Sequence, residues 1–156
     1  LIEQMLEKDE HNLYYIDVYT DILLAQKEYQ LCLDMLEQQY LLRPNNQVVT
    51  LNYANAALTS GAPRLAIHLL KSLLFYKSDN ILAYDLLSEA YKAVGDFARF
   101  YEARADLSYQ RADYPRAIDD LNEALNHLKP EEKLENRRLE AKKRQLQTEF
   151  DRLRRM

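Results

Sequence analysis

Residues 46–61 read NQVVTLNYANAALTSG, and residues 80–95, which lie 34 positions further along the chain, read NILAYDLLSEAYKAVG. Both stretches begin with an asparagine and end on one of the chain's two glycines, Gly61 and Gly95. The same spacing relates further sets of residues: Tyr19, Tyr53 and Leu87; Thr20, Ala54 and Ser88; Cys32, Ala66 and Phe100; Leu36, Leu70 and Arg104. Self-similarity at a fixed period predicts an array of stacked repeats.

A period of 34 residues is that of the tetratricopeptide repeat, in which each unit is a pair of antiparallel helices. The distribution of proline agrees, because an interior proline breaks a helix and all four prolines fall where helices are expected to start or stop: Pro44, Pro63, Pro115 and Pro130. The sequence therefore predicts an all-α fold without strands. We expect a right-handed solenoid of antiparallel helix pairs that ends in a long C-terminal capping helix.

The predicted organisation is one repeat domain over residues 1–156. Residues 1–8 read as the end of a preceding, truncated helix, which makes the chain a fragment. Gly61 is expected in the left-handed C-terminal position of one helix, with Pro63 opening the next. Ser78 or Asp79 is expected to cap the third repeat, and Asp96 its second helix. The three predicted repeats are 12–44, 46–78 and 79–111.

The pattern changes near Phe100, where the repeat calls for a small residue. Residues 113–129 read as an irregular fourth repeat, with Ala117, Leu121 and Ala124 in its packing positions. Two explanations stay open here: one helix is shared between the third and fourth repeats, or the array departs from regular stacking. Residues 130–156 are predicted to form the capping helix, with an apolar stripe made of Leu139, Leu146, Phe150 and Leu153.

Charge and composition argue against several classes of protein. The net charge is −4, and it is uneven: from Lys129 onward 10 basic and 6 acidic residues give +4, whereas 11 basic and 19 acidic residues before it give −8. An acidic body disfavours nucleic-acid binding, and the basic tail, interleaved with glutamates, is typical of a solvated helix face. No apolar run approaches the ~20 residues of a membrane span. The single cysteine, Cys32, reads as a small buried residue.

Residues that could carry catalysis are sparse. His11, His68 and His127 have no second histidine, cysteine or paired carboxylate at a metal-ligand spacing. There is no HExxH, no GxSxG and no glycine-rich phosphate loop. We expect no catalytic residue, no metal and no cofactor in this chain.

Two groups of residues are predicted to contact a partner. Phe75 and Tyr76 are adjacent, so both cannot face one helix seam, and at least one is expected to be exposed as an anchor. The first helices of such repeats line the concave face. The expected lining is Tyr14, Asp17, Asp21 and Leu24; Val48, Leu51, Asn55 and Leu58; and Leu82, Asp85, Glu89 and Lys92. This mixed apolar and acidic set favours a peptide or loop ligand.

Several segments resemble the C-terminal repeat domain of the bacterial beta-barrel assembly-enhancing protease family. They are His11-Asn12-Leu13-Tyr14-Tyr15 with Asp17-Val18, Leu51-Asn52 with Ala54-Asn55-Ala56, Asp85-Leu86-Leu87, and Ala103-Arg104-Ala105. The resemblance implies a parent that is a periplasmic zinc metalloprotease, whose HExxH domain precedes the repeats and lies outside this chain. It implies that the chain recruits the protease to the outer-membrane barrel-assembly machinery and to barrel substrates for quality control. The parent's own protease domain is a further expected partner.

Three functional hypotheses follow. The first is this non-catalytic docking domain, and the second is a free-standing tetratricopeptide scaffold for a peptide or helical partner, unrelated to proteolysis. The third, an enzyme with an unrecognised site, is disfavoured by the missing motifs. An HExxH motif upstream in the complete reading frame would separate the first two.

Overall fold

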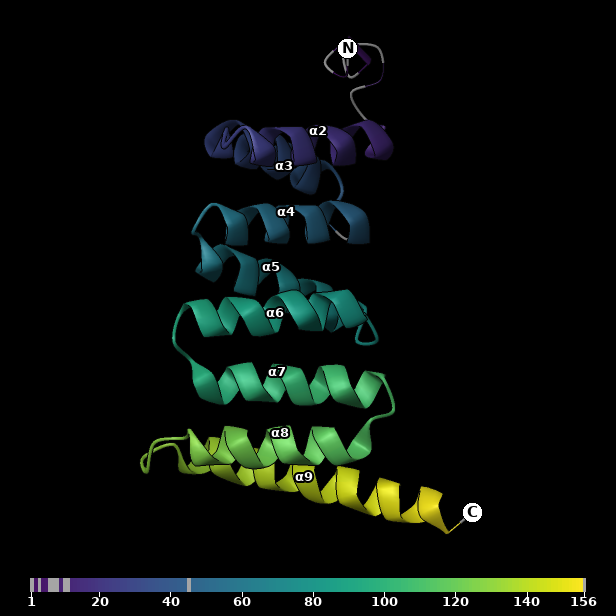
Figure 1. Cartoon of the computed structure of the whole chain (residues 1–156), viewed down its shortest axis with the longest axis vertical. Helices are drawn as coiled ribbons and strands as arrows, with labels where there is room; N and C mark the ends of the chain where they lie inside the picture. The colour runs from purple at the N-terminus through teal and green to yellow at the C-terminus, as the bar shows by residue number, and fades with distance from the viewer. Residues whose placement is uncertain (1, 3, 6–8, 10–11, 45, 156) are drawn as a thin grey trace. The chain divides into compact units, whose positions relative to one another are not determined.

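The computed structural model describes residues 2, 4–5, 9, 12–44 and 46–155, and this part of the chain contains helices and no strand. The predicted all-α fold is therefore confirmed. Figure 1 labels the helices from residue 13 onward: α2 (Leu13–Ala25), α3 (Tyr29–Leu42), α4 (Gln47–Thr59), α5 (Pro63–Tyr76), α6 (Ile81–Ala93), α7 (Phe97–Gln110), α8 (Tyr114–Asn126) and α9 (Lys133–Arg154). Most of the helix predicted at residues 1–8, and also His11, lie outside the described residues.

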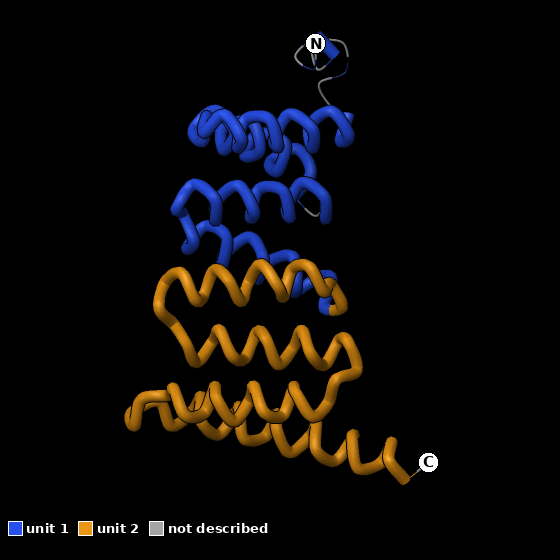
Figure 2. Tube along the Cα trace, viewed as in Figure 1, with its two compact units in different colours: residues 1–78 blue, residues 79–156 orange. Residues whose placement is uncertain are grey.

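The chain divides into two compact units, residues 1–78 and 79–156, which are coloured separately in Figure 2. The first unit holds α2 to α5, and the second holds α6 to α9.

Asparagine side chains begin the first helix of each predicted repeat. The oxygens of Asn12, Asn46 and Asn80 accept hydrogen bonds from the backbone N–H groups of Tyr14, Val49 and Ala83, at 3.1, 3.1 and 2.9 Å respectively. Each bond satisfies a donor that has no partner within the helix. The prediction that Ser78 or Asp79 caps α6 is wrong, because Asn80 holds that position. Asp96 caps α7 as predicted, by accepting a hydrogen bond from the N–H of Arg99.

Left-handed backbone ends the first helix of each repeat. Gly61 has a φ of +82° and Gly95 a φ of +75°. A glycine at these positions is expected to adopt such a left-handed conformation. The corresponding position of the first repeat is Lys27, 34 residues before Gly61, and it keeps this geometry with a φ of +61°. The turn is therefore a property of the repeat, and the first copy forms it at the cost of some backbone strain.

Small residues form the closest contacts in the first unit. α2 packs on α3 and α4, and α4 also packs on α3 and α5. Cys32, Ala54 and Ala66 are completely buried, and Thr20 is nearly so. The Thr20 hydroxyl donates to the carbonyl of Ile16 at 2.8 Å, so this polar group is satisfied inside its own helix. Those positions of the 34-residue recurrence that hold small residues thus lie in the close-packed interior of the first unit.

The second unit stacks differently. α7 packs on both α6 and α8, and α8 packs on α9, whereas the backbones of α6 and α8 do not approach each other closely within the described residues. Phe100, at a position where the first unit has Cys32 and Ala66, is buried in α7. α7 thus has the neighbours that a helix shared between the third and fourth repeats would have. A shared helix is one of the two explanations that the sequence left open. The repeat boundaries themselves stay a prediction.

The last helix closes the core of the second unit. Leu139 and Leu146 of α9 join a buried cluster with Ala105 of α7 and with Ala117, Leu121 and Ala124 of α8. Two details of the predicted cap are wrong. α9 begins at Lys133 rather than at Pro130, because Pro130 and Glu131 lie in a turn. Leu153 is 46% exposed, because α9 has by then run past the end of that cluster.

We expect Ala54→Leu or Ala66→Leu to destabilise the protein by about 1–3 kcal/mol, because each alanine is fully buried at a helix contact. Thermal unfolding followed by circular dichroism would measure the loss. Ala141→Leu is the matched control, since Ala141 lies on the exposed side of α9. Unchanged melting temperatures for all three variants would mean that the repeat phase is misplaced.

The two ends of the predicted apolar stripe of α9 should contribute differently to the free energy of unfolding. Leu139→Ala removes a side chain that is only 1% exposed, and we expect it to cost about 2–4 kcal/mol. Leu153→Ala should change the free energy of unfolding by less than about 0.5 kcal/mol, because Leu153 faces solvent. Urea unfolding of the two variants would make the comparison. Equal losses would contradict the described position of α9.

Candidate partner-binding surfaces

The first predicted contact surface lies on α2 of the first unit. Tyr14 is 70% exposed, and Asp17 and Asp21 are also exposed. Their spacings of three and four residues put these side chains on one side of the helix. This side offers an aromatic ring followed by two carboxylates.

The neighbouring helix α4 extends this surface. Asn55 is exposed and Leu51 is half-buried, and they are four residues apart. The side-chain amide of Asn52 donates a hydrogen bond of 2.7 Å to Asp17 of α2, which joins the two helices. The structure therefore brings five predicted residues together on adjacent helices of one unit: Tyr14, Asp17, Asp21, Leu51 and Asn55.

Tyr14 also borders a cavity that is mostly apolar. The cavity measures about 530 Å³ and is lined by Ile2, Met5, Tyr14, Tyr15, Val18 and Ile22. The rings of Tyr14 and Tyr15 meet edge to face with centroids 6.0 Å apart. An apolar side chain of a partner could therefore be buried beside Tyr14.

The predicted residues of the third repeat lie on α6, in the second unit. Asp85 and Glu89 are exposed and four residues apart, so they share one side of the helix. Glu89 pairs with Lys92 at 3.7 Å, but both side chains are more than half exposed and the pair contributes little to stability. A partner's basic group could therefore displace this pairing at small cost.

Phe75 and Tyr76, the last residues of α5, are both turned away from the core. Phe75 is 82% exposed and Tyr76 is 62% exposed. Their rings meet nearly perpendicular, with centroids 5.2 Å apart. The core side of α5 is filled by Ala66, Leu69, Leu70 and Leu73. The expected exposure is confirmed, and the expected contact with a partner stays a prediction.

A charge network between α7 and α9 was not predicted from the sequence. Arg138 of α9 donates two hydrogen bonds of 2.6 Å to the carboxylate of Glu102 on α7. Lys142 lies 3.0 Å from Glu102 and 2.7 Å from Asp106. The signal was present, because Glu102 and Asp106 are four residues apart on one helix and Arg138 and Lys142 are four apart on another.

The network changes the pKa values of its two carboxyl groups in opposite directions. Burial alone would raise the pKa of Glu102, but hydrogen bonds from Arg138 and the charge of Lys142 outweigh it and lower the pKa to about 2. For Asp106 burial prevails over the attraction of Lys142, and the pKa is raised. Glu102 is therefore the charged anchor that holds α9 to α7.

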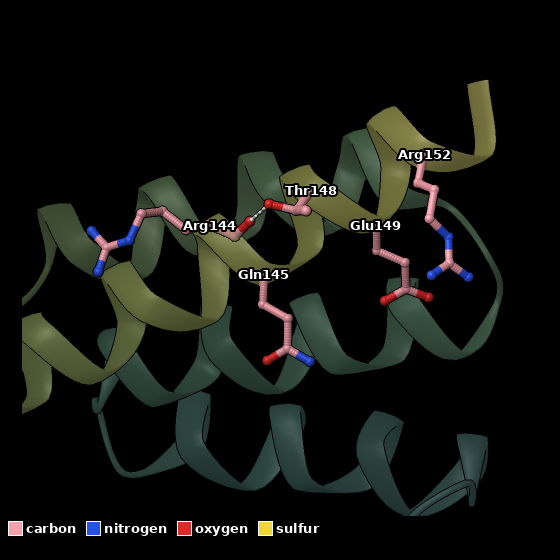
Figure 3. A pocket seen from close by; sticks show the side chains of 5 residues that line it. All are labelled: Arg144, Gln145, Thr148, Glu149 and Arg152. Carbon is pink, nitrogen blue, oxygen red and sulfur yellow. Dashed lines mark hydrogen bonds between the residues drawn. The ribbon is translucent and has the colours of Figure 1, made fainter. Parts of the chain in front are cut away.

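A second polar contact joins the far half of α9 to α7 and α8. Glu149 accepts a hydrogen bond of 2.8 Å from the Tyr114 hydroxyl and one of 3.4 Å from the Tyr109 hydroxyl. Figure 3 shows an adjacent cavity of about 440 Å³, which is lined by Arg144, Gln145, Thr148, Glu149 and Arg152. All five residues belong to α9, so this cavity is a shallow surface feature of one helix.

Side chains that could carry chemistry do not converge in the described part of the chain. No group of three or more histidine, cysteine or acidic side chains there could hold a metal ion. His68 is exposed, and the exposed ring of His127 stacks on Tyr101 with centroids 5.3 Å apart. Cys32 is buried, and burial raises the pKa of its thiol, which keeps it in the unreactive form. Among the described helices, none is both long enough and apolar enough to cross a bilayer.

The fold is shared with solved structures of MamA. MamA from Desulfovibrio magneticus RS-1 aligns with a TM-score of 0.61 and 16% identity, over 96% of this chain and 84% of the MamA chain. A MamA RS-1 double mutant aligns equally well, over 98% and 83% of the two chains. The predicted tetratricopeptide-like fold is confirmed.

Sequence comparison identifies relatives of known name. The chain is 30% identical over 128 residues, 82% of its length, to the beta-barrel assembly-enhancing protease of Escherichia coli (strain K12). It is 28% identical over 129 residues to the protein of the same name from Yersinia pestis. The predicted resemblance is confirmed: the chain is homologous to part of these proteases. It spans only about a quarter, 26%, of their length. No protein-family model matches.

We expect Glu102→Gln to lower the free energy of unfolding at pH 7 by about 1–3 kcal/mol, because it leaves Arg138 and Lys142 without their shared carboxylate. The pKa of Glu102 is lower in the folded chain than in the unfolded one, so its contribution is present above about pH 4.5 and is lost as the pH falls toward 2. The difference in melting temperature from the parent should therefore shrink over that range. Glu89→Gln, in an exposed pair, is the control. A difference that is independent of pH would contradict this role of Glu102.

Proposed function

We propose that this chain is the docking part of a larger envelope protease that acts in the assembly of outer-membrane barrels. In this role it is not catalytic. It recruits the protease to the barrel-assembly machinery and to barrel substrates, so that misassembled barrels are handled where they are made. The homology to beta-barrel assembly-enhancing proteases over 82% of the chain is the observation that carries this proposal.

The structure supports the docking role through its exposed surfaces. In the first unit, two exposed aromatic rings end α5, and α2 and α4 together present Tyr14, Asp17, Asp21, Leu51 and Asn55. Asp85 and Glu89 add exposed carboxylates on α6 of the second unit. Phe75 fits the role of an aromatic anchor for a partner's pocket, because aromatic residues dominate binding hot spots. The carboxylates would help the chain to discriminate between partners, since charges at an interface contribute more to specificity than to affinity.

The wider setting follows from the family resemblance. We infer that the parent is a periplasmic metalloprotease whose zinc and HExxH motif lie in a separate domain, and that this domain is itself a partner of the repeats. The residues of this chain would then supply recruitment, and the other domain would supply hydrolysis. A free-standing scaffold is the competing function, and the complete reading frame separates the two.

Phe75→Ala tests the docking surface. Pull-down of the barrel-assembly machinery from solubilised outer membranes should fall by about tenfold or more, because a buried aromatic anchor contributes ~2 kcal/mol. Helicity and melting temperature should hardly change, since the ring is 82% exposed. Leu41→Ala is the matched control, because Leu41 is 71% exposed on α3 and is not a predicted contact. Unchanged pull-down by a folded Phe75→Ala variant would remove Phe75 from the interface, and unfolding would place it in the core.

A further inference from the structure

The outward side of α9 carries a row of basic residues. Residues seven, eleven or eighteen positions apart lie within about 20° of each other around a helix, so Arg137, Arg144 and Arg155 share one side. Lys133 and Arg152 lie next to them, and all five side chains are exposed. From Lys133 to Arg155 the row rises by 22 residue steps of 1.5 Å, or about 33 Å. Figure 3 shows Arg144 and Arg152 on either side of Thr148.

The acidic residues of α9 do not neutralise this row. Glu135 pairs with Arg138 at 2.8 Å, Glu140 pairs with Lys143 at 3.1 Å, and Glu149 is held by two tyrosines. Arg138 and Lys142 are in turn engaged by α7. Within the described residues, the five cations of the row form no ion pair, and the exposed acids beside them are Asp151 and, in the turn before α9, Glu131. The folded helix therefore turns a mixed charge pattern into a one-sided basic surface.

The row lacks the features of a site for a protein partner. Protein interfaces bury an apolar or aromatic centre in which charged residues are depleted. Between Arg137 and Arg155 the other outward positions are held by Ala141, Thr148 and Asp151. The exposed large apolar side chains of α9 are Leu134 at its start and Leu153, which lies on the opposite side of the helix from the row. Four of the five cations are arginines, whose planar guanidinium groups bind phosphate oxygens in pairs. This chemistry fits a surface of phosphate groups better than a protein surface.

We propose that the outward side of α9 binds the headgroups of an anionic phospholipid bilayer, so that the second unit rests on a membrane surface without entering it. A straight row on a convex helix can touch a flat surface along its whole length, and each basic residue adds to the attraction. A duplex nucleic acid is the less suitable occupant, because its phosphates wind around an axis and a straight row about 33 Å long meets few of them at once, whereas it can meet a flat bilayer along its whole length. On α6 of the same unit, the exposed Asp85 and Glu89 disfavour contact through that helix.

Co-sedimentation with lipid vesicles tests the proposal on the full 156-residue chain. The chain should bind vesicles of phosphatidylcholine with about one third phosphatidylglycerol, and it should not bind phosphatidylcholine alone. Binding should weaken strongly between about 0.1 and 0.5 M NaCl, because salt screens these contacts. Arg137→Glu with Arg144→Glu should reduce the partition coefficient by about tenfold or more.

The control is Arg64→Glu with Lys71→Glu on α5, which changes the net charge equally at two exposed cations away from α9. It should bind the anionic vesicles nearly as well as the parent. Equal losses for both double variants would show that net charge alone decides binding and would overturn the proposal. So would absent binding by the parent, or binding to a 30-base-pair DNA duplex that is as tight as binding to the vesicles. Pure lipid contains no protein partner, so these results are independent of the docking function proposed above.

Discussion

The closeness of neighbouring helices is the constraint on which the rest of this structure depends. A two-helix unit cannot bury its apolar side alone, so each pair must pack on the next. In the first unit this requires side chains no larger than those of Cys32, Ala54 and Ala66, which are completely buried. Within the units, the left-handed turns at Gly61 and Gly95 then bring α5 back alongside α4 and α7 back alongside α6. The side of each first helix that is not packed in this way carries the exposed residues Tyr14, Asp17, Asn55 and Asp85.

The features that repeat were the easiest to predict from the sequence, and most of the errors concern features that occur once. A 34-residue period predicted the helices and the turns at both glycines, because each copy supports the reading of the others. The start of α9 was misplaced, since Pro130 can begin a helix or lie in a turn, and only tertiary packing decides. Exposure of Phe75 and Tyr76 could be predicted because α5 already had its core residues. The ion pairs of Glu102 with Arg138 and Lys142 were missed, because the four-residue spacings within each helix mark possible partners, but charges 36–40 residues apart can be matched only once the two helices are aligned.

The class of protein and its biological setting are inferred from different observations. The class of protein rests on architecture: a tetratricopeptide-like fold with exposed aromatic and acidic side chains on the first helices is suited to binding other proteins. The biological setting rests on homology to proteases of which this chain spans about a quarter. The exposed rings of Phe75 and Tyr76 connect the two, because a large apolar side chain held in water gains stabilisation only when something covers it. The basic row on α9 is chemically distinct from these surfaces.

The pattern of helix contacts also has a consequence for how the chain acquires its structure. Every packed pair of helices, from α2 with α3 to α8 with α9, is at most two elements apart in the sequence. Contacts this local require little loop closure, so either unit can begin to fold as soon as two of its neighbouring helices meet. The ion pairs between α7 and α9 add contacts that hold the last helix to the second unit.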